Sequence, residues 1–314
     1  MNHPNLAEAL AAFGADRARF INESENVVFE VRVGGEKAAL RLHRPGYQSD
    51  ATLRSELWWV QALAKVGVPV PLPIAAKDGA LTARMADGQM ASLVAWVEGA
   101  SLRASGENLA GTCAEQEAIF YTIGKTLGHL HNAADNLVLP DWFTRHSWDI
   151  DGFLGEAPFW GRFWENPSLS ADEVSVLQRA RAVARDRLQV FHNNGADFGL
   201  IHADPIRGNV FEHDGKVTLI DFDDAGFGFR VYDLAVLMTQ NEGLENTAAL
   251  QASAVAGYRS ERPLSDEAES LLPMFIMLRR LASTGWIVSR AELGSEWVRN
   301  YTERAVQAAR AFLR

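Results

Sequence analysis

The sequence predicts an α+β protein of two lobes: a small antiparallel sheet with one main helix, then a larger and mostly helical lobe. Short apolar runs separated by turn residues fill the first third of the chain, whereas helical periodicity dominates from residue 114 onward. The chain has 314 residues, which is enough to bury a sizeable core in two lobes. We place the boundary so that residues 1–97 form the N-lobe and residues 98–314 form the C-lobe.

The N-lobe is expected to begin with a short helix and continue as an antiparallel sheet. The leading helix is predicted over Leu6–Phe13. Two consecutive glycines, Gly34 and Gly35, are read as a hairpin turn. Strands are predicted over residues 19–22, 27–33 and 38–43, on both sides of the turn at 78–79, and over 90–97.

One long helix is predicted inside the N-lobe. Ser49 or Asp50 caps its start, and Gly67 ends it after Val66. Apolar residues recur at helical spacing over 53–64, which indicates one buried face.

The C-lobe is predicted to be mostly helical. Ser170 and Glu173 form a capping box that opens a helix running to about Asn194. The stretch from Asp141 to Trp164 is rich in tryptophan and interrupts the helices; it is either a substrate-specificity insert or an aromatic cap on the core. Further helices are predicted over residues 115–134, 232–240, 248–259, 266–290 and 292–313.

Composition narrows the class of protein. The net charge of −10 disfavours nucleic acid or an anionic membrane as a partner and permits a cationic substrate. No apolar run approaches the ~18 residues of a membrane span, and the first ten residues do not resemble a secretory signal. The single cysteine, Cys113, excludes an internal disulfide. A cytoplasmic protein is therefore expected, while the oligomeric state is not predicted.

The stretch from Leu200 to Ala235 carries the chemistry. A hairpin is predicted there, with the Asp214–Gly215 turn between two apolar strands. This hairpin brings Asn209 and Asp221 to the same end, and Asp204 lies one short loop before it. An amide oxygen and a carboxylate suit Mg²⁺, which keeps phosphates and waters in its other positions. A second carboxylate is then free to orient a hydroxyl group and take its proton.

The spacing of these residues resembles the catalytic and metal-binding loops of the protein-kinase-like superfamily. The pattern is His202-x-Asp204-x-x-x-x-Asn209, followed by a strand that ends in Asp221-Phe222. The acidic run Asp221-Phe222-Asp223-Asp224, followed by Tyr232-Asp233-Leu234-Ala235, looks like the aminoglycoside phosphotransferase and choline kinase branch. Type II homoserine kinases and bacterial stress-response kinases look nearest. If only the His-x-Asp-x-x-x-x-Asn pattern were present, a solvated hairpin with acidic turns would be an equally good interpretation.

The resemblance implies a catalytic loop over 200–209 and a metal loop over 220–224. Asp204 is the implied catalytic base, while Asn209 and Asp221 hold Mg²⁺, with Asp223 as a helper. Ile206 stands where relatives place a lysine or a histidine, so either Arg207 would supply the γ-phosphate contact or that contact would be absent. The family also implies that the aspartate of the Tyr-Asp-Leu-Ala run braces the catalytic loop through backbone hydrogen bonds.

ATP would bind between the lobes. Arg41 stands in a strand where the family more often has lysine, and Glu56 matches its helix partner. Lys37, on the same strand face, is the alternative phosphate contact. The turn over residues 22–26 would cover the phosphates, and the backbone of the hinge at Trp96 and Val97 would contact the adenine. Two side chains of that turn, Ser24 and Asn26, would supplement its backbone donors.

The predicted function is ATP- and Mg²⁺-dependent transfer of a phosphoryl group to a hydroxyl of a small, amine-bearing molecule. Because catalysis of this kind is mostly positioning and charge neutralisation, no covalent enzyme intermediate is expected. Two alternatives stay open at this point. One is a protein Ser/Thr kinase of the bacterial stress-response type, and the other is a nucleotide-binding regulator with little catalysis.

Overall fold

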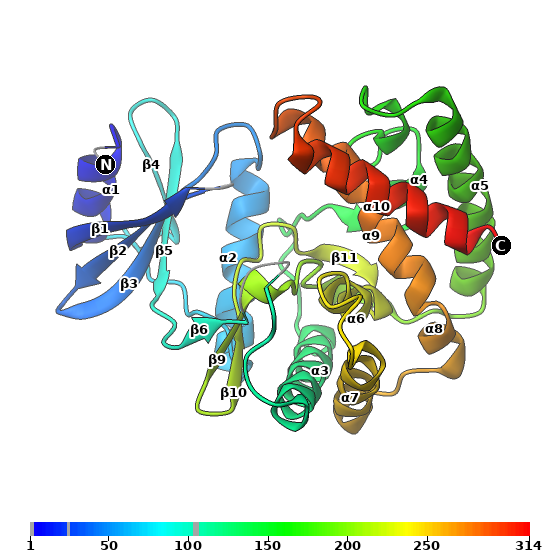
Figure 1. Cartoon of the computed structure of the whole chain (residues 1–314). Helices are drawn as coiled ribbons and strands as arrows, with labels where there is room; N and C mark the ends of the chain where they lie inside the picture. Colours follow the sequence, from blue (N-terminus) through cyan, green and yellow to red (C-terminus); the bar gives the residue numbers. More distant parts are fainter. Residues whose placement is uncertain (1–2, 24–25, 103–106) are drawn as a thin grey trace. The chain divides into compact units, whose positions relative to one another are not determined.

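The structure is a computed structural model that describes residues 3–23, 26–102 and 107–314 (Figure 1). Contacts between Cα atoms divide the chain into two compact units. The first combines Met1–Leu102, Asn136–Arg145 and Asn209–Asp223, and the second combines Arg103–Asp135, His146–Gly208 and Asp224–Arg314. Each unit is thus assembled from several segments. The division into continuous lobes at residue 97 stays a prediction.

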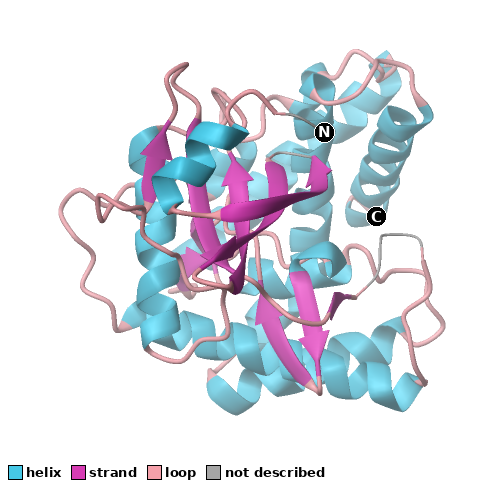
Figure 2. Ribbon diagram, turned by 90° about the vertical axis from the view of Figure 1, so that its left-hand side faces the viewer, coloured by secondary structure: helices cyan, strands magenta, loops and turns pink. Residues whose placement is uncertain are grey.

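A five-stranded antiparallel sheet forms the centre of the first unit, in the order β1-β2-β3-β5-β4 (Figure 2). The strands are β1 (Asp16–Glu23), β2 (Val27–Val33), β3 (Glu36–Leu42), β4 (Thr82–Arg84) and β5 (Met90–Ala95). Two helices flank it, α1 (Leu6–Phe13) and α2 (Asp50–Lys65). Most of these elements confirm the predicted N-lobe pattern.

The two faces of this sheet are covered by different helices because side chains alternate along a strand. Leu40 and Leu42 of β3 are fully buried in the cluster that contains α1. Ala39, which directly precedes Leu40 on the strand, packs instead with Leu53 and Leu57 of α2. The β3 side chains of odd number therefore face α2, as Figure 1 also shows for the arrangement of α1, the sheet and α2.

A side-chain cap fixes the start of α2, and prolines limit strand formation before residues 78–79. Ser49 caps α2 by accepting a hydrogen bond from the Thr52 backbone N–H at 3.2 Å, as predicted. Of the strands predicted on both sides of residues 78–79, only β4 forms; before the turn there is a single bridge between Pro73 and Val94. The run Val68–Pro73 alternates with prolines, which lack the N–H needed for a continuous ladder.

A second, three-stranded sheet of the first unit contains the predicted hairpin. It has the order β10-β9-β6, with β9 (Val210–His213), β10 (Lys216–Leu219) and β6 (Ala100–Ser101). Asp214 and Gly215 form the two-residue turn with φ of 50° and 74°. Positive φ at both positions is the type I′ geometry that the strand twist favours, so the hairpin is confirmed.

The second unit is mostly helical, with one small sheet in the order β7-β11-β8. The α3–α7 pair packs closely because Gly124 of one helix and Gly257 of the other have no room for a Cβ atom. Its helices are α3 (Cys113–Asp135), α4 (Ile150–Leu154), α5 (Ala171–Asn193), α6 (Val231–Met238), α7 (Thr247–Glu261), α8 (Asp266–Ser270), α9 (Leu272–Trp286) and α10 (Glu296–Phe312). Its strands are β7 (Ser147–Trp148), β8 (Phe198–Ile201) and β11 (Gly226–Phe229), and short 3₁₀ turns occur at Phe163–Glu165, Arg207–Asn209 and Ile287–Ser289.

The predicted helix over 266–290 is wrong as a single element. The chain instead forms α8 and α9, and Pro273 lies in the first turn of α9. A proline suits the first turn of a helix but cannot continue one, so it separates α8 from α9.

The Ser170–Glu173 capping box at the start of α5 is confirmed, with both reciprocal bonds present.

The tryptophan-rich segment contributes to the core of the second unit. Trp148 is fully buried, and its ring lies 5.3 Å from Phe153 and 5.6 Å from Tyr232, centroid to centroid. Trp160 lies 5.1 Å from Trp148. These contacts fit the interpretation as an aromatic cap on the core. Across the described residues, no helix is both long and apolar enough to cross a membrane.

Candidate active site

Asn209 and Asp221 lie together at the open end of the β9–β10 hairpin. The Ile220 backbone N–H donates to the Asn209 carbonyl at 2.9 Å, which continues the ladder by one bond. Asn209 is buried, whereas the Asp221 side chain is 40% exposed. Asp221 has φ of 65°, a conformation that non-glycine residues rarely adopt and that often marks functional positions.

This pair fits a magnesium ion by its donor chemistry. Mg²⁺ commonly takes one or two side-chain oxygens from the protein and completes its octahedron with phosphates and waters. In the described part of the chain, no three His, Cys, Asp or Glu side chains form a metal cluster. These residues therefore do not form a metal site made of protein ligands alone. They offer two ligands, one amide oxygen and one exposed carboxylate.

Arg41 links this hairpin end to α2. As a residue of odd number on β3 it faces α2, and its Nη1 donates to Glu56 Oε1 at 3.1 Å. Its Nη2 lies 3.4 Å from Asp221 Oδ1 and is ion-paired with Asp223 Oδ1. Burial opposes the charge, but the surrounding carboxylates raise the pKa of Arg41, so the guanidinium stays protonated. The structure thus brings together the predicted pair of Arg41 and Glu56.

Glu56 is held by a second arginine that sequence reasoning missed. Arg145 Nη1 lies 3.7 Å from Glu56 Oε2, and Gln48 Nε2 donates to the same oxygen at 3.2 Å. Arg145 Nη2 also donates to the carbonyls of Phe222 at 3.1 Å and Asp223 at 2.6 Å. Burial raises the pKa of Glu56, while the two guanidinium groups oppose that shift. Arg145 lies in an irregular stretch with no periodic signal, so nothing local identified it.

Asp223 and Asn26 are hydrogen-bonded to each other. Asn26 Nδ2 donates to Asp223 Oδ2 at 2.6 Å, and Asn26 Oδ1 accepts from the Arg44 backbone N–H at 3.3 Å. Burial acts to raise the pKa of Asp223, but the charge of Arg41 outweighs burial and lowers this pKa, so the side chain is a carboxylate. Both oxygens of Asp223 therefore accept bonds from side chains. The roles predicted for Asp223 at the metal and for Asn26 at phosphates stay predictions, and Ser24 lies outside the described residues.

The predicted hinge follows β5. Trp96 and Val97 are both half-buried, and the Trp96 backbone N–H donates to the Lys37 carbonyl at 3.4 Å. The Lys37 ammonium lies 3.5 Å from Glu98 Oε1 and 5.7 Å from the centre of the Trp96 ring. Lys37, the alternative phosphate contact, therefore already has an acidic and an aromatic neighbour, and the adenine contact of the hinge stays a prediction.

In the second unit, a buried aspartate braces the loop that follows β8. Asp233 accepts from the backbone N–H groups of His202 at 2.9 Å and Ala203 at 2.7 Å. His131 Nε2 lies 3.0 Å from Asp233 Oδ2. Although burial opposes it, His131 lowers the pKa of Asp233, so the brace is charged. Ala203 has φ of 64°, and the predicted bracing role of Asp233 is confirmed.

Asp204 follows this braced turn and is ion-paired with Arg279 of α9. The Asp204 side chain is 13% exposed, and Arg279 Nη1 also donates to the Ala203 carbonyl at 3.3 Å. The Arg279 guanidinium lies 4.3 Å from the centre of the Trp160 ring. Arg279 thus fixes the carboxylate from one side. Whether Arg279 faces Asp204 or solvent could not be predicted from the sequence, because the two residues lie 75 positions apart.

Arg207 is buried in the second unit. Its Nε donates to Asn241 Oδ1 at 2.8 Å, its Nη1 to the Glu107 carbonyl at 2.5 Å, and its backbone N–H to Gln240 Oε1 at 3.1 Å. Burial lowers the pKa of Arg207. These contacts occupy two of its guanidinium nitrogens. Its predicted contact with the γ-phosphate stays a prediction.

Residues 17–271 match the model of the phosphotransferase enzyme family. The chain belongs to this family. The match covers more than half of the chain and includes both the Arg41–Glu56 pair and the loop from Asp204 to Asp221. This assignment confirms the predicted resemblance and makes the chain an enzyme of the kinase type.

Individual members of the phosphotransferase enzyme family extend the comparison. The chain is 25% identical to amicoumacin kinase of Bacillus subtilis over 92% of its own length and 86% of that protein. It is 32% identical to homoserine kinase of Mesorhizobium japonicum over 79% of its own length and 76% of that protein. Among solved structures, a microcompartment-associated aminopropanol kinase is 32% identical with a TM-score of 0.78, covering 97% of this chain and 93% of that one. The predicted protein-kinase-like fold is confirmed.

Proposed function

We propose that this phosphotransferase uses ATP and Mg²⁺ to phosphorylate a hydroxyl group of a small, amine-bearing molecule. The observation that carries the proposal is that Asn209 and the exposed Asp221 lie at one end of the hairpin. Asn209 also follows Asp204 by five residues, and Asp204 comes directly after the braced Ala203. Relatives named for aminopropanol, homoserine and amicoumacin support a small-molecule acceptor. The net charge of −10 supports an amine on that acceptor.

Asp204 acts on the acceptor hydroxyl in this proposal. Its carboxylate orients the hydroxyl and takes its proton as the oxygen attacks phosphorus. The braced turn at Ala203 and the ion pair with Arg279 hold the carboxylate in one orientation, which lowers the entropic cost of reaching the reactive geometry.

Asn209 and Asp221 hold Mg²⁺, which neutralises charge on the phosphates when it is bound. Arg41, anchored by Glu56, contacts the phosphates. The backbone of Trp96 and Val97 contacts the adenine. We extend the proposal to the remaining predicted contacts, with Asp223 beside the metal, Ser24 and Asn26 at the phosphates, and Arg207 at the γ-phosphate.

Nucleotide binding is expected to require a divalent cation. The stretch from Leu200 to Ala235 carries seven acidic residues against three basic ones, so negative charge is in excess there. Phosphates without a metal would add to that repulsion. Calorimetric titration with ATP should show tight binding in Mg²⁺ or Mn²⁺ and weak binding in EDTA. Equal affinity in both conditions would remove the metal from the proposal.

Arg41 is expected to contribute to ATP affinity. A charge-assisted contact of this kind contributes roughly 1.5–3 kcal/mol, so Arg41→Ala should weaken ATP binding by that amount and Arg41→Lys should keep part of it. The alanine variant also leaves Glu56 and Asp223 short of a cation, so its melting temperature should fall. Calorimetry with Mg²⁺-ATP and thermal unfolding measure the two effects.

Arg19→Ala is the matched control because Arg19 is an exposed arginine of the same sheet, paired with Glu30. It should change neither ATP affinity nor, by more than a few tenths of a kcal/mol, stability. An unchanged ATP dissociation constant in Arg41→Ala would shift the phosphate contact to another cation, and Lys37 would be tested next.

A further inference from the structure

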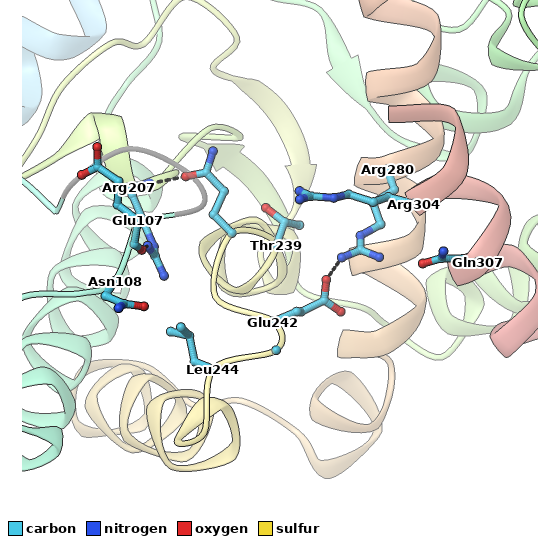
Figure 3. A pocket seen from close by; sticks show the side chains of 11 residues that line it. Glu107, Asn108, Arg207, Thr239, Glu242, Leu244, Arg280, Arg304 and Gln307 are labelled. Atoms are coloured by element: carbon cyan, nitrogen blue, oxygen red, sulfur yellow. Dashed lines mark hydrogen bonds and ion pairs between the residues drawn. The ribbon is translucent and has the colours of Figure 1, made fainter. Parts of the chain in front are cut away.

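The second unit contains a cavity of about 430 Å³ with an unusual balance of charge (Figure 3). Its walls come from the segment after α6, from α9 and α10, and from the loop that carries Arg207. The charged residues of the lining are Glu107, Arg207, Glu242, Arg280 and Arg304.

Positive charge is in excess in this lining, although the chain as a whole carries −10. The Arg207 guanidinium is bonded to an amide and a carbonyl, neither of which neutralises it. Arg280 is ion-paired with Glu242. Arg304 has no hydrogen bond or ion pair with any residue that the structure describes, and it is exposed.

Arg280 and Arg304 repel each other. They come from neighbouring helices, α9 and α10, and Figure 3 shows both at the wall that these helices form, with Arg207 on the opposite side in this view. Burial and the charge of Arg304 lower the pKa of Arg280 to about 10, even though Glu242 contacts it. An anionic group placed between the two guanidinium groups would relieve this repulsion.

Two elements of the second unit that line the cavity also carry the proposed catalytic base and its ion-pair partner. Arg280 follows Arg279, whose guanidinium is paired with Asp204. Arg207 lies three residues after Asp204 on the same loop. A ligand in the cavity therefore lies against the elements that position Asp204.

We propose that this cavity binds the phosphoryl acceptor and that the acceptor carries a carboxylate besides its hydroxyl. This inference rests on the proposed phosphotransferase function. Arg304 and Arg280 bind the carboxylate, since guanidinium groups match its planar geometry. Glu242, which contacts Arg280 from the segment after α6, offers a partner for an ammonium group, so a hydroxy amino acid fits better than an amino alcohol.

The reaction balances without a further reagent. A bond forms between the acceptor hydroxyl oxygen and the γ-phosphorus of ATP, and the bond from that phosphorus to the β–γ bridging oxygen breaks. The hydroxyl proton passes to Asp204, and ADP leaves with the electron pair of the broken bond.

The test compares two substrates that differ only in the carboxylate, L-homoserine and 3-aminopropan-1-ol, and adds 4-hydroxybutyrate, which lacks the amine. Wild-type enzyme should show a higher kcat/KM for L-homoserine than for 3-aminopropan-1-ol. Arg304→Gln should lower kcat/KM for L-homoserine and 4-hydroxybutyrate by roughly 10- to 100-fold, mainly through KM, because a bond to a charged group is lost. The value for 3-aminopropan-1-ol should change less than about threefold on the same reasoning.

Arg310→Gln is the matched control, since Arg310 is an exposed arginine of α10 outside the cavity. Calorimetric titration of each compound without ATP gives a second readout, in which Arg304→Gln should lose affinity only for the two carboxylates. Turnover of 3-aminopropan-1-ol in preference to L-homoserine, or an equal loss on all three compounds, would overturn the carboxylate inference while the phosphotransferase function stands. Absence of phosphorylation of any hydroxyl compound, with no carboxylate binding either, would overturn both.

Discussion

Replacing Asp204 by asparagine is expected to lower kcat by about 10²- to 10⁴-fold, the usual contribution of a positioned acid–base group. Asparagine keeps the shape of the side chain but cannot take the hydroxyl proton. Its amide oxygen still accepts a bond from Arg279, which limits the loss of stability. The affinity for Mg²⁺-ATP should stay near that of the wild type, because the proposed metal ligands are Asn209 and Asp221.

The control for this variant is Asp214→Asn, the same substitution in the same stretch of chain. Asp214 lies at the hairpin turn with φ of 50°, a conformation that asparagine adopts readily, so this change removes a charge without altering the backbone. Initial rates with an acceptor that the wild-type enzyme phosphorylates, together with calorimetry with Mg²⁺-ATP, should separate the two variants. Normal turnover by Asp204→Asn would show that another group takes the proton.

Asp221→Asn is expected to abolish Mg²⁺-dependent nucleotide binding as well as turnover. The Asp221 carboxylate is the exposed anion at the hairpin end, and a neutral amide is a far weaker ligand for a hard divalent cation. Asparagine also tolerates the φ of 65° at this position, so the local backbone should persist. We expect a loss of at least 10²-fold in kcat/KM, the order seen when one electrostatic stabilising group is removed.

The contrast between the two variants is the decisive measurement. Asp204→Asn should bind Mg²⁺-ATP and fail in chemistry, whereas Asp221→Asn should fail in both. Titrations over a range of Mg²⁺ concentrations would detect a residual weak metal site. If Asp221→Asn retained tight, metal-dependent ATP binding, the ion would have to be held elsewhere.

Local signals predicted much of this fold because the energies that decide it are local. The type I′ turn at Asp214–Gly215 requires two positive φ values, which this residue pair adopts at little cost, so the hairpin and the pairing of Asn209 with Asp221 follow from nearby residues. Ser49 caps α2 and Ser170 caps α5 by bonds within their own first turns. The predicted helix over 266–290 is interrupted at Pro273, which suits the first turn of a helix but cannot continue one.

Side-chain alternation extended the prediction to one contact between distant residues. Arg41 faces α2 because neighbours on β3 point to the opposite face, and Glu56 is one of the buried residues of α2. The family resemblance named these two residues as partners, and the structure brings them to 3.1 Å. Sequence could not show that Asp223 and Asp221 would share the same guanidinium.

The sequence by itself determined the family and the hairpin, since these depend on motif spacing and turn chemistry, while the family resemblance implied the brace on the loop before Asp204. Only the tertiary structure decided the partners: Arg145 at Glu56, Arg279 at Asp204, and the two arginines of α9 and α10 that meet in one cavity. Arg145 and Arg279 each come from a segment far along the chain from the acidic partner. Burial in a medium of low dielectric makes such pairing necessary, but many acids would satisfy a given arginine, so packing alone selects which one it meets.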